Sequence, residues 1–327
     1  MQQPRRRRFL IRSGAMLALP GLVLAQNRSY RVAYLSGVTA KVSEPYEKMF
    51  FSRLAELGYR EDRNLVIERR YAEGDLDRLP ALAKELVALN PDLIVTPLLP
   101  PTLAALKATR TIPIVFVAVG DPLGTGIVKN LARPEGNATG TSANNRQMHG
   151  KQLQMLKEML PGARRVVFLF NPLNPGEIGH LAALKADAPK LGLSLQQVGV
   201  EKEAGFPQAF KSIELAKPDA LYVAQGTFTL MHVARIMEFA NARKLPVVGG
   251  TPQYVEAGAL MTYGSSIEEP LRIAAAQTAK ILKGAKPADL PVEQVTVYEL
   301  VINMKAAKAI RITIPQSVLV RADRVIE

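Results

Sequence analysis

The chain of 327 residues has no cysteine, only three histidines, and only 6% aromatic residues. Without cysteine we expect no disulfide, no thiolate nucleophile, no cysteine-bound metal and no lipoprotein anchor. Too few aromatic residues lie among the basic ones to stack against nucleic-acid bases. We therefore expect no nucleic-acid partner, although the formal net charge is +13.

Patterns typical of catalysis and of metal or nucleotide binding are also missing. The histidines follow no H-E-x-x-H pattern, and no G-x-S-x-G nucleophile elbow occurs. The paired carboxylates Asp75 and Asp77 lie in a turn before a helix, where capping is the expected role. No Walker loop is present, and the first expected strand, "YRVAYLSG", ends in a single glycine. The sequence thus predicts no catalytic residues, no metal site and no cofactor.

Much of the positive charge lies at the N-terminus. Five arginines precede an apolar segment that ends in Val23-Leu24-Ala25, an order typical of an export signal cleaved near Ala25. Its removal would lower the charge from +13 to +8. The segment "RRRFL" also fits a twin-arginine signal, so both Tat and Sec export stay open. The apolar run is shorter than the ~20 residues that span a bilayer. We expect a periplasmic mature protein; a basic disordered tail is the alternative.

Beyond Tyr30, short β-rich runs alternate with amphipathic helices, which predicts parallel sheets built from βαβ units. The first of these helices is expected from about Pro45 to Leu57. The same order of strands occurs twice. The runs "YRVAYLSG", "NPDLIVTPL" and "TIPIVFVAVG" correspond to "RRVVFLFNP", "KPDALYVAQG" and "KLPVVGG". Matching positions, such as Arg31 and Arg165 or Pro91 and Pro218, are separated by similar distances along the chain. We therefore predict two similar α/β, Rossmann-like lobes; one large sheet is the alternative.

Ligands of open parallel sheets bind beyond the carboxyl ends of the strands, where loops converge and helix N-termini present free N–H groups. Two lobes that face each other in this way would enclose a cleft for a small molecule. The predicted ligand-binding residues follow strands in the first lobe (Ser36, Gly37, Thr96, Gly120, Asp121) and in the second (Asn171, Asn174, Gln225, Thr227, Gly250, Thr251), with Tyr263 as an aromatic wall.

The stretch "VAVGDPLGTGIVKNLARPEGNATG" is rich in glycine, as phosphate loops are. Asp121, however, would bring a negative charge toward a phosphate, which is the wrong sign. We interpret the stretch as turns and a short helix, "GIVKNL", followed by "ATGTS", which continues into the second lobe.

Several of these side chains have a purely structural alternative. Asp121 could pair with a ligand ammonium group or cap the helix expected to follow it. Asn171 and Asn174 could bind a carboxylate or form Asx turns. Thr227 could donate to the ligand or cap a helix, and Tyr263 could pack in the core.

Blocks along the chain resemble the ABC transporter substrate-binding protein family of the TrpX type. They include "AELGYREDRNLVIERRYAEGDLDRLPALAKEL", the run from Gly120 to Gly140, "NPLNPG", "VEAGALMTYGSS", "KILKGAKPADLPVEQ" and "ELVINMKAAKAI". The resemblance covers about Tyr30 to Glu327. It implies the periplasmic-binding-protein type I fold, in which two lobes joined by a three-strand hinge close on a small ligand. It also implies a monomer that delivers the ligand to a membrane permease and its ATPase.

Some relatives bind aromatic amino acids, so the resemblance implies an amino acid or a related small organic acid as ligand. This chain departs from the family at "TPLLPPTL", where relatives often show "TSGTPAAL". We expect a stiffer and more apolar cleft wall there. The identity of the ligand therefore cannot be transferred.

The resemblance also sets the expected lobe boundaries. A signal peptide would cover residues 1–25, the first lobe residues 26–139 and 257–284, and the second lobe residues 140–256 and 285–327. Crossovers are expected near Asn137–Ser142, Val255–Gly258 and Gly284–Glu293. A ligand sensor that presents the bound solute to a membrane receptor is the alternative function. A repressor would need a helix-turn-helix where this chain has its predicted signal.

Overall fold

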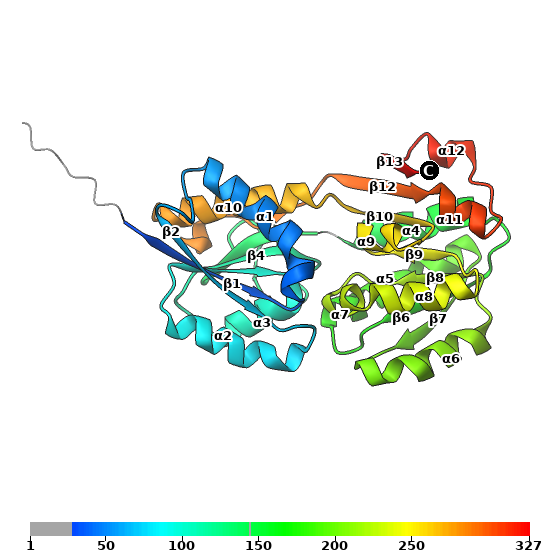
Figure 1. Cartoon of the computed structure of the whole chain (residues 1–327), viewed down its shortest axis with the longest axis horizontal. Coiled ribbons are helices and arrows are strands. Elements are labelled where there is room, and N and C mark those ends of the chain that lie inside the picture. Colours follow the sequence, from blue (N-terminus) through cyan, green and yellow to red (C-terminus); the bar gives the residue numbers. More distant parts are fainter. Residues whose placement is uncertain (1–27, 144) are drawn as a thin grey trace, which may run out of the picture.

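The computed structural model describes residues 28–143 and 145–327, with the side chains of residues 145–147 left out. The predicted signal peptide, with its twin-arginine pattern, lies outside the described residues. Two α/β lobes lie side by side, each built on its own sheet (Figure 1). This arrangement confirms the predicted fold class and excludes the alternative of one large sheet.

The first lobe contains a parallel sheet with the strand order β11-β5-β4-β3-β1-β2. Its strands are β1 (Tyr30–Ser36), β2 (Leu65–Tyr71), β3 (Leu93–Pro97), β4 (Ile114–Val119), β5 (Ala138–Ser142) and β11 (Glu293–Gln294). Its helices are α1 (Ala40–Glu56), η1 (Leu76–Arg78), α2 (Leu79–Ala88), α3 (Leu99–Ala108), α10 (Glu268–Leu282) and η4 (Pro287–Asp289).

Apolar residues cover both faces of this sheet, as they must in a parallel sheet with helices on each side. In β1, Val32 and Tyr34 pack toward α1 and α10, whereas Ala33 and Leu35 pack toward α2 and α3. The alternation follows from the two-residue period of a strand. The central strands β1, β3 and β4 therefore each belong to two hydrophobic cores, and their carboxyl ends are left for the loops.

The second lobe contains the sheet β13-β12-β10-β9-β8-β6-β7, in which β10 and β12 are antiparallel. Its strands are β6 (Arg165–Phe170), β7 (Ser194–Gly199), β8 (Ala220–Val223), β9 (Val247–Gly249), β10 (Met261–Ser265), β12 (Tyr298–Asn303) and β13 (Arg324–Ile326). One face carries α4 (Asn145–Met159), α5 (Pro175–Asp187), η2 (Ala188–Leu191), α11 (Met304–Ala309) and α12 (Gln316–Leu319). The other carries η3 (Glu203–Gly205), α6 (Phe206–Ala216), α7 (Thr227–Met231), α8 (Val233–Ala242) and α9 (Pro252–Glu256).

The lobes are joined after β5, between β10 and α10, and between β11 and β12. These connections differ from the predicted boundaries. Residues 261–265 form β10, which pairs with β9 and β12 in the second sheet rather than with the first. Residues 293–294 form β11, which pairs with β5 in the first sheet. The strand "ALMTYG" alone does not show which sheet it joins, because both would bury its apolar side chains.

The connecting segments are tied to one another and to α10. Ser266 donates its backbone N–H to the Val297 carbonyl at 2.9 Å. The Glu269 carboxylate accepts backbone N–H bonds from Thr296 at 3.0 Å and Val297 at 2.9 Å. The hinge between the lobes is therefore a hydrogen-bonded unit rather than a set of independent linkers.

The predicted short helix "GIVKNL" is wrong: residues 127–131 form irregular turns. Gly126 has a φ of 73°, and the Asn130 side chain accepts the backbone N–H groups of Ala132 and Arg133. Ile127 and Val128 are buried against the α2–α3 side of the first sheet. These local bonds and contacts compete with helix formation.

Candidate ligand-binding site

A cavity of about 120 Å³ lies between the lobes at the carboxyl ends of both sheets. A water needs ~10–15 Å³ on this scale, so the cavity has space for a small organic molecule rather than a single water. The first lobe contributes residues at or after the carboxyl ends of β1, β3, β4 and β5 and residues on α1 and α10. The second contributes residues after β8 and β9, residues at and after the end of β10, and residues of β12.

Helix N-termini converge on this cavity. The residues just before α1 (Ser36, Gly37 and Val38) line it, as do those just before α10 (Ser265, Ser266 and Ile267). The N-terminus of a helix carries partial positive charge and free N–H groups. Among the residues whose side chains are described, Glu299 is the charged residue of the lining. The lining thus offers hydroxyl and N–H groups suited to a carboxylate.

Several polar atoms of the lining are buried without a hydrogen-bond partner among the described residues. They are Gln225 Oε1, Thr227 Oγ1, Thr251 Oγ1, Thr262 Oγ1 and Ser265 Oγ. Buried polar atoms are rarely left unpaired in proteins, because each costs the free energy of its lost hydration. A bound ligand could supply partners to this group.

Much of the rest of the lining is apolar. Leu98 follows β3 and Ala118 lies near the end of the adjacent β4, and both have left-handed backbone conformations, with φ of 65° and 54°. Non-glycine residues in this region are strained, and such strain is often found at functional sites. Pro97 and Leu98 line the cavity, and both belong to the predicted apolar wall "TPLLPPTL".

The structure brings half of the predicted site residues to this cavity. Those that line it are Ser36, Gly37, Gln225, Thr227, Gly250 and Thr251. Those that do not are Thr96, Gly120, Asp121, Asn171, Asn174 and Tyr263. The first group lies where the carboxyl end of a strand leads into the N-terminus of a helix, and Asn171 and Asn174 have the same position without lining the cavity.

Three of the predicted residues that do not line the cavity, Asp121, Thr96 and Tyr263, are held outside it by contacts within their own lobes. Asp121 is exposed, and its carboxylate accepts the Gly124 N–H at 2.8 Å in a turn, with no helix following. The Thr96 hydroxyl is bonded to that of Thr102 at 2.9 Å. Tyr263 is buried and stacks on Tyr298, with ring centroids 5.8 Å apart. The position of Tyr263 fits its structural alternative of packing in the core, whereas Asp121 neither lines the cavity nor caps a helix and instead holds a turn.

Asn171 and Asn174 line a groove on the interlobe seam rather than the cavity. Asn171 Oδ1 accepts the Leu173 N–H at 2.8 Å, and Asn174 caps α5. Both also donate to Glu177, from the Asn171 backbone N–H at 2.7 Å and from Asn174 Nδ2 at 2.8 Å. Burial raises the pKa of Glu177 to about 7, against these two bonds. Gly120 lies with Asn174 and Glu177 in a small side chamber next to the cavity.

Three further residues line the cavity that no sequence pattern indicated: Ser43 and Tyr46 of α1, and Tyr34 of β1. The helix was expected to begin at Pro45, because proline favours the first turn. The helix instead begins at Ala40, with Thr39 as N-cap and Pro45 inside it. The signal was Thr39 in "GVTAK", an N-cap residue soon after the first strand.

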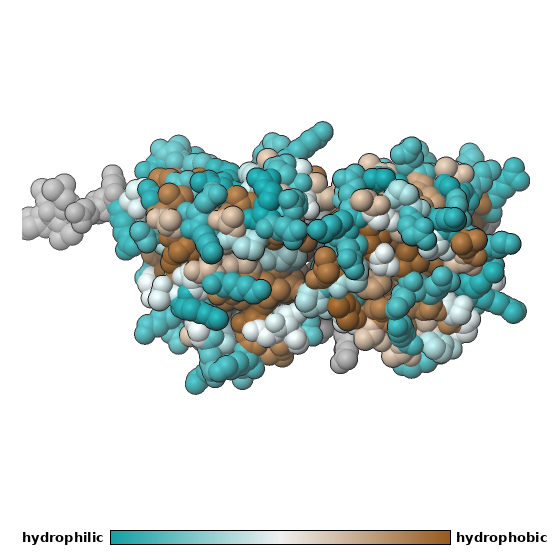
Figure 2. All heavy atoms as spheres, turned by 90° about the horizontal axis from the view of Figure 1, so that it is seen from below, coloured by the Kyte–Doolittle hydropathy of each residue, from teal (hydrophilic) through white to brown (hydrophobic). Residues whose placement is uncertain are grey.

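The lobes touch each other around the cavity. Gln253 Nε2 of α9 donates to the Tyr46 hydroxyl of α1. Gly37 faces Thr227, and Lys202 Nζ lies 3.6 Å from Asp77 Oδ2. In Figure 2, hydrophobic residues flank the seam between the lobes on the face seen from below. The groove there is lined by apolar residues that include Leu99, Leu103, Leu173, Phe228 and Met231.

The described residues contain neither a candidate membrane span nor a candidate metal site. No helix there combines the length and the apolar character of a membrane span. Among the same residues, no three His, Asp or Glu side chains are grouped so that they could hold a metal ion.

Comparison with known proteins adds a family. Residues 45–326 match the family described as ABC transporter substrate binding protein. A tyrosine-binding protein of Clostridioides difficile (strain R20291) is 28% identical over 278 residues, which cover 84% of this chain and 80% of that protein.

Two solved structures are also similar. One is an ABC domain in complex with L-Trp from Streptococcus pneumonia, with a TM-score of 0.86 and 28% identity over 91% of this chain and 100% of the other. The second is the ligand-free, open structure of a substrate binding protein with adhesive properties from Clostridium difficile. Its TM-score is 0.65, with 26% identity over 91% of this chain and 99% of the other.

Proposed function

The chain belongs to the ABC transporter substrate binding protein family, and from this premise we propose that it is the periplasmic component of an importer. In this proposal it binds one small ligand between its lobes. The ligand is an amino acid with an apolar or aromatic side chain, or a related small organic acid. The family is one of binding proteins, not of enzymes.

The observation that carries the proposal is the mixed chemistry of the cavity. Hydroxyl groups and helix N-termini of both lobes contribute to its lining, where a carboxylate would gain charge-assisted hydrogen bonds. Leu98, Val117, Leu230 and Ile267 form apolar parts of the lining, together with the rings of Tyr34 and Tyr46. A carboxylate joined to an apolar side chain satisfies both parts.

The similar proteins support the same ligand class. One relative is named for tyrosine, and one similar structure contains L-Trp. Tyr34 and Tyr46 would offer this chain aromatic contacts of the kind that stabilise such side chains. Aromatic amino acids are therefore the first ligands to test.

Closure of the lobes is the proposed binding mechanism. The two similar structures have nearly equal identity to this chain, but the TM-score is 0.86 with the L-Trp complex and 0.65 with the ligand-free, open structure. A rotation between lobes lowers a TM-score over the whole chain without changing either lobe. The comparison, with the Tyr46–Gln253 bond across the cleft, supports a closed conformation here and an open one before binding.

We further propose that the closed monomer delivers its ligand to a membrane permease and its ATPase. Export would follow the Tat or Sec route, with cleavage near Ala25. The predicted signal carries five arginines and no acid, so its removal would leave a less basic mature protein.

The test is a thermal-shift screen of the mature chain, from Gln26, against the amino acids, aromatic and branched organic acids, and sugars. A ligand at 100 times its Kd adds about 2.7 kcal/mol to the free energy of unfolding, which raises the Tm by several degrees. Ser265→Ala, in the cavity, should reduce the shift, and Asp121→Ala, outside it, should not. A folded protein that responds to none of these compounds would refute the proposed ligand class.

A further inference from the structure

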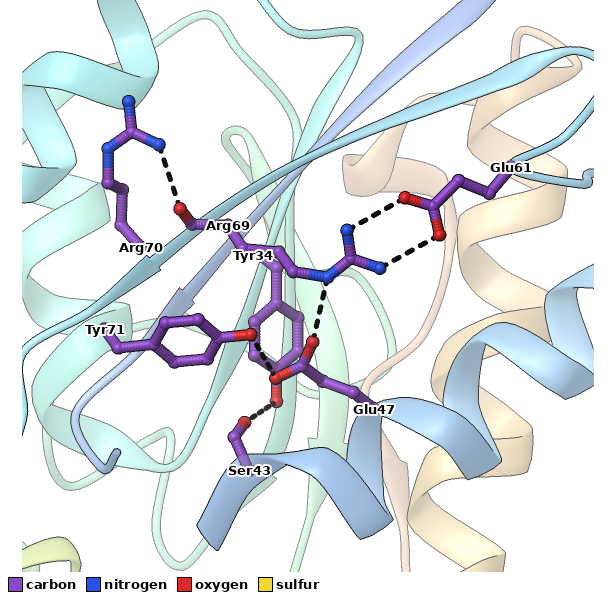
Figure 3. Close-up of polar contacts among 7 residues, drawn as sticks. All are labelled: Tyr34, Ser43, Glu47, Glu61, Arg69, Arg70 and Tyr71. Atoms are coloured by element: carbon purple, nitrogen blue, oxygen red, sulfur yellow. Dashed lines mark hydrogen bonds and ion pairs between the residues drawn. The ribbon is translucent and has the colours of Figure 1, made fainter. Parts of the chain in front are cut away.

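A cluster of polar side chains connects α1 to β2 next to the cavity residues Tyr34 and Ser43 (Figure 3). Glu47 of α1 accepts a hydrogen bond from Arg69 Nε at 3.1 Å and one from the Tyr71 hydroxyl at 2.8 Å. We call these three residues the α1 clamp. Arg69 also forms a two-bond ion pair with Glu61, at 2.9 and 3.0 Å.

The two acids beside Arg69 differ in burial. The Glu47 side chain is 9% exposed, whereas that of Glu61 is 56% exposed. Charge-assisted bonds gain strength as water is excluded, and exposed ion pairs contribute little. Burial and the bond to Glu47 both raise the pKa of Tyr71, so its hydroxyl keeps its proton and donates. The bond from Arg69 to Glu47 is therefore the less exposed of the two to water, whereas the pair with Glu61 makes two bonds.

The same helix also contributes to the cavity, with residues next to Glu47 on its surface. Ser43, one turn before Glu47, bonds to the Tyr34 hydroxyl at 3.0 Å, and both residues line the cavity. Tyr46, the neighbour of Glu47, lines the cavity and accepts the bond from Gln253 of the other lobe. Any rotation of α1 at Glu47 would move Ser43 and Tyr46 together.

The backbone alone holds this part of α1 weakly. Pro45 lies inside the helix and has no N–H to donate to the carbonyl of Lys41. The first turn also has no acidic residue to interact with the helix dipole. The segment that carries Ser43 and Tyr46 therefore depends on side-chain bonds for its orientation.

We propose that Glu47 is a positioning residue of the ligand site. Through the α1 clamp it fixes the rotation of α1, so that Ser43 and Tyr46 face the ligand and Tyr46 meets Gln253 when the lobes close. This inference rests on the proposed function for its effect on binding, but its structural part does not. Glu47 itself is absent from the cavity lining and acts through Ser43 and Tyr46.

The structural part is tested by amide hydrogen exchange on the full mature chain without ligand. Glu47→Gln keeps the size of the side chain but places an amide against Arg69. Glu61→Gln is the matched control, since it removes the other acid of the same arginine. We expect exchange in residues 40–47 to become about tenfold faster in Glu47→Gln, from the loss of a charge-assisted bond, and to stay unchanged in Glu61→Gln. Equal exchange in both variants would overturn the proposal.

The functional part uses L-tyrosine and L-tryptophan as probes in titration calorimetry. Glu47→Gln should bind the probe about tenfold more weakly than the wild type, and Glu61→Gln equally well. Tyr46→Phe removes the hydroxyl that meets Gln253. If Glu47 acts through Tyr46, the two substitutions should not be independent. The double variant Glu47→Gln/Tyr46→Phe should then lose less affinity than the product of the fold-losses of the two single variants. Strictly additive losses would overturn this route.

The two parts fail separately. If the wild type binds neither probe, the proposed ligand class fails, and hydrogen exchange still decides whether Glu47 fixes α1. If the wild type binds a probe but Glu47→Gln binds it with wild-type affinity, the positioning role is wrong and the proposed function stands.

Discussion

Replacing Gly37 with alanine should weaken ligand binding by keeping the lobes apart. A Cβ at this position would lie 2.7 Å from Thr227 Cγ2 of the other lobe, whereas ordinary contacts begin at 3.4 Å. It would also lie 3.2 Å from Leu76 Cδ2, at the flexible end of a side chain in its own lobe. Gly37 has no positive φ, so alanine fits the local backbone. The conflict is therefore specific to the closed lobes.

The expected size follows from the overlap. Extra methyl groups in well-packed contacts cost about 1–3 kcal/mol, which corresponds to about 5- to 150-fold in Kd. Partial relief by rotation of Thr227 favours the lower end, and we expect about tenfold weaker binding. The Tm without ligand should stay equal or rise slightly, because alanine restricts the unfolded chain more than glycine does.

The assay is titration calorimetry with the ligand identified by the thermal-shift screen. Thr227→Ser provides the control, because it removes Cγ2 and keeps a hydroxyl. The double variant Gly37→Ala/Thr227→Ser should bind nearly as well as Thr227→Ser alone. Wild-type affinity in Gly37→Ala, or no recovery in the double variant, would refute the reasoning that Gly37 and Thr227 meet in the bound state.

Three further outcomes are expected. Asp121→Ala should leave the Kd unchanged and lower the free energy of unfolding by about 1 kcal/mol through the lost turn bond to Gly124; a large loss of affinity would contradict its placement. The pKa of Glu177 is raised from 4.5 to about 7, so the folded state keeps a proton that the unfolded state has released between these values. Its stabilising contribution is complete below pH 4.5 and is lost as the pH rises through 7. Between pH 4.5 and 7 the free energy of unfolding of Glu177→Gln, measured with urea, should therefore rise by up to about 3 kcal/mol relative to that of the wild type. A difference between the two proteins that does not change with pH would disprove this. Glu269→Gln should lower the free energy of unfolding by about 1–2 kcal/mol by weakening the hinge bond to Val297, and unchanged urea unfolding would argue against that role.

Periodicity and resemblance predicted the two-lobed fold because the parallel strands are apolar on both faces and are separated by amphipathic helices. Local signals were less reliable where they competed. Pro45 indicated a helix start, yet α1 begins at Ala40. Similarly, the apolar run "GIVKNL" favoured a helix, but Gly126 and the Asn130 side chain hold it as turns.

The candidate site was predictable where it depends on topology alone. Ser36 ends β1, and Gly37, Gly250 and Thr251 come just after strands, so the carboxyl-end rule located them. Whether a polar side chain after a strand turns toward the cavity or back to its own loop depends on a few hydrogen bonds, as for Asp121. The sequence shows the residue but not the choice between these bonds.

The three connections between the lobes also have a consequence for the order of folding. One side of the first sheet is covered by α10, whose Leu271, Ala274 and Ile281 pack in the same core as Val32 and Phe50. Because α10 and β11 come late in the chain, a ribosome that has finished β5 has not yet made the residues that complete this lobe. The N-terminal lobe is therefore first in sequence but among the last to be finished, and until then the apolar face that α10 covers is exposed, which favours aggregation.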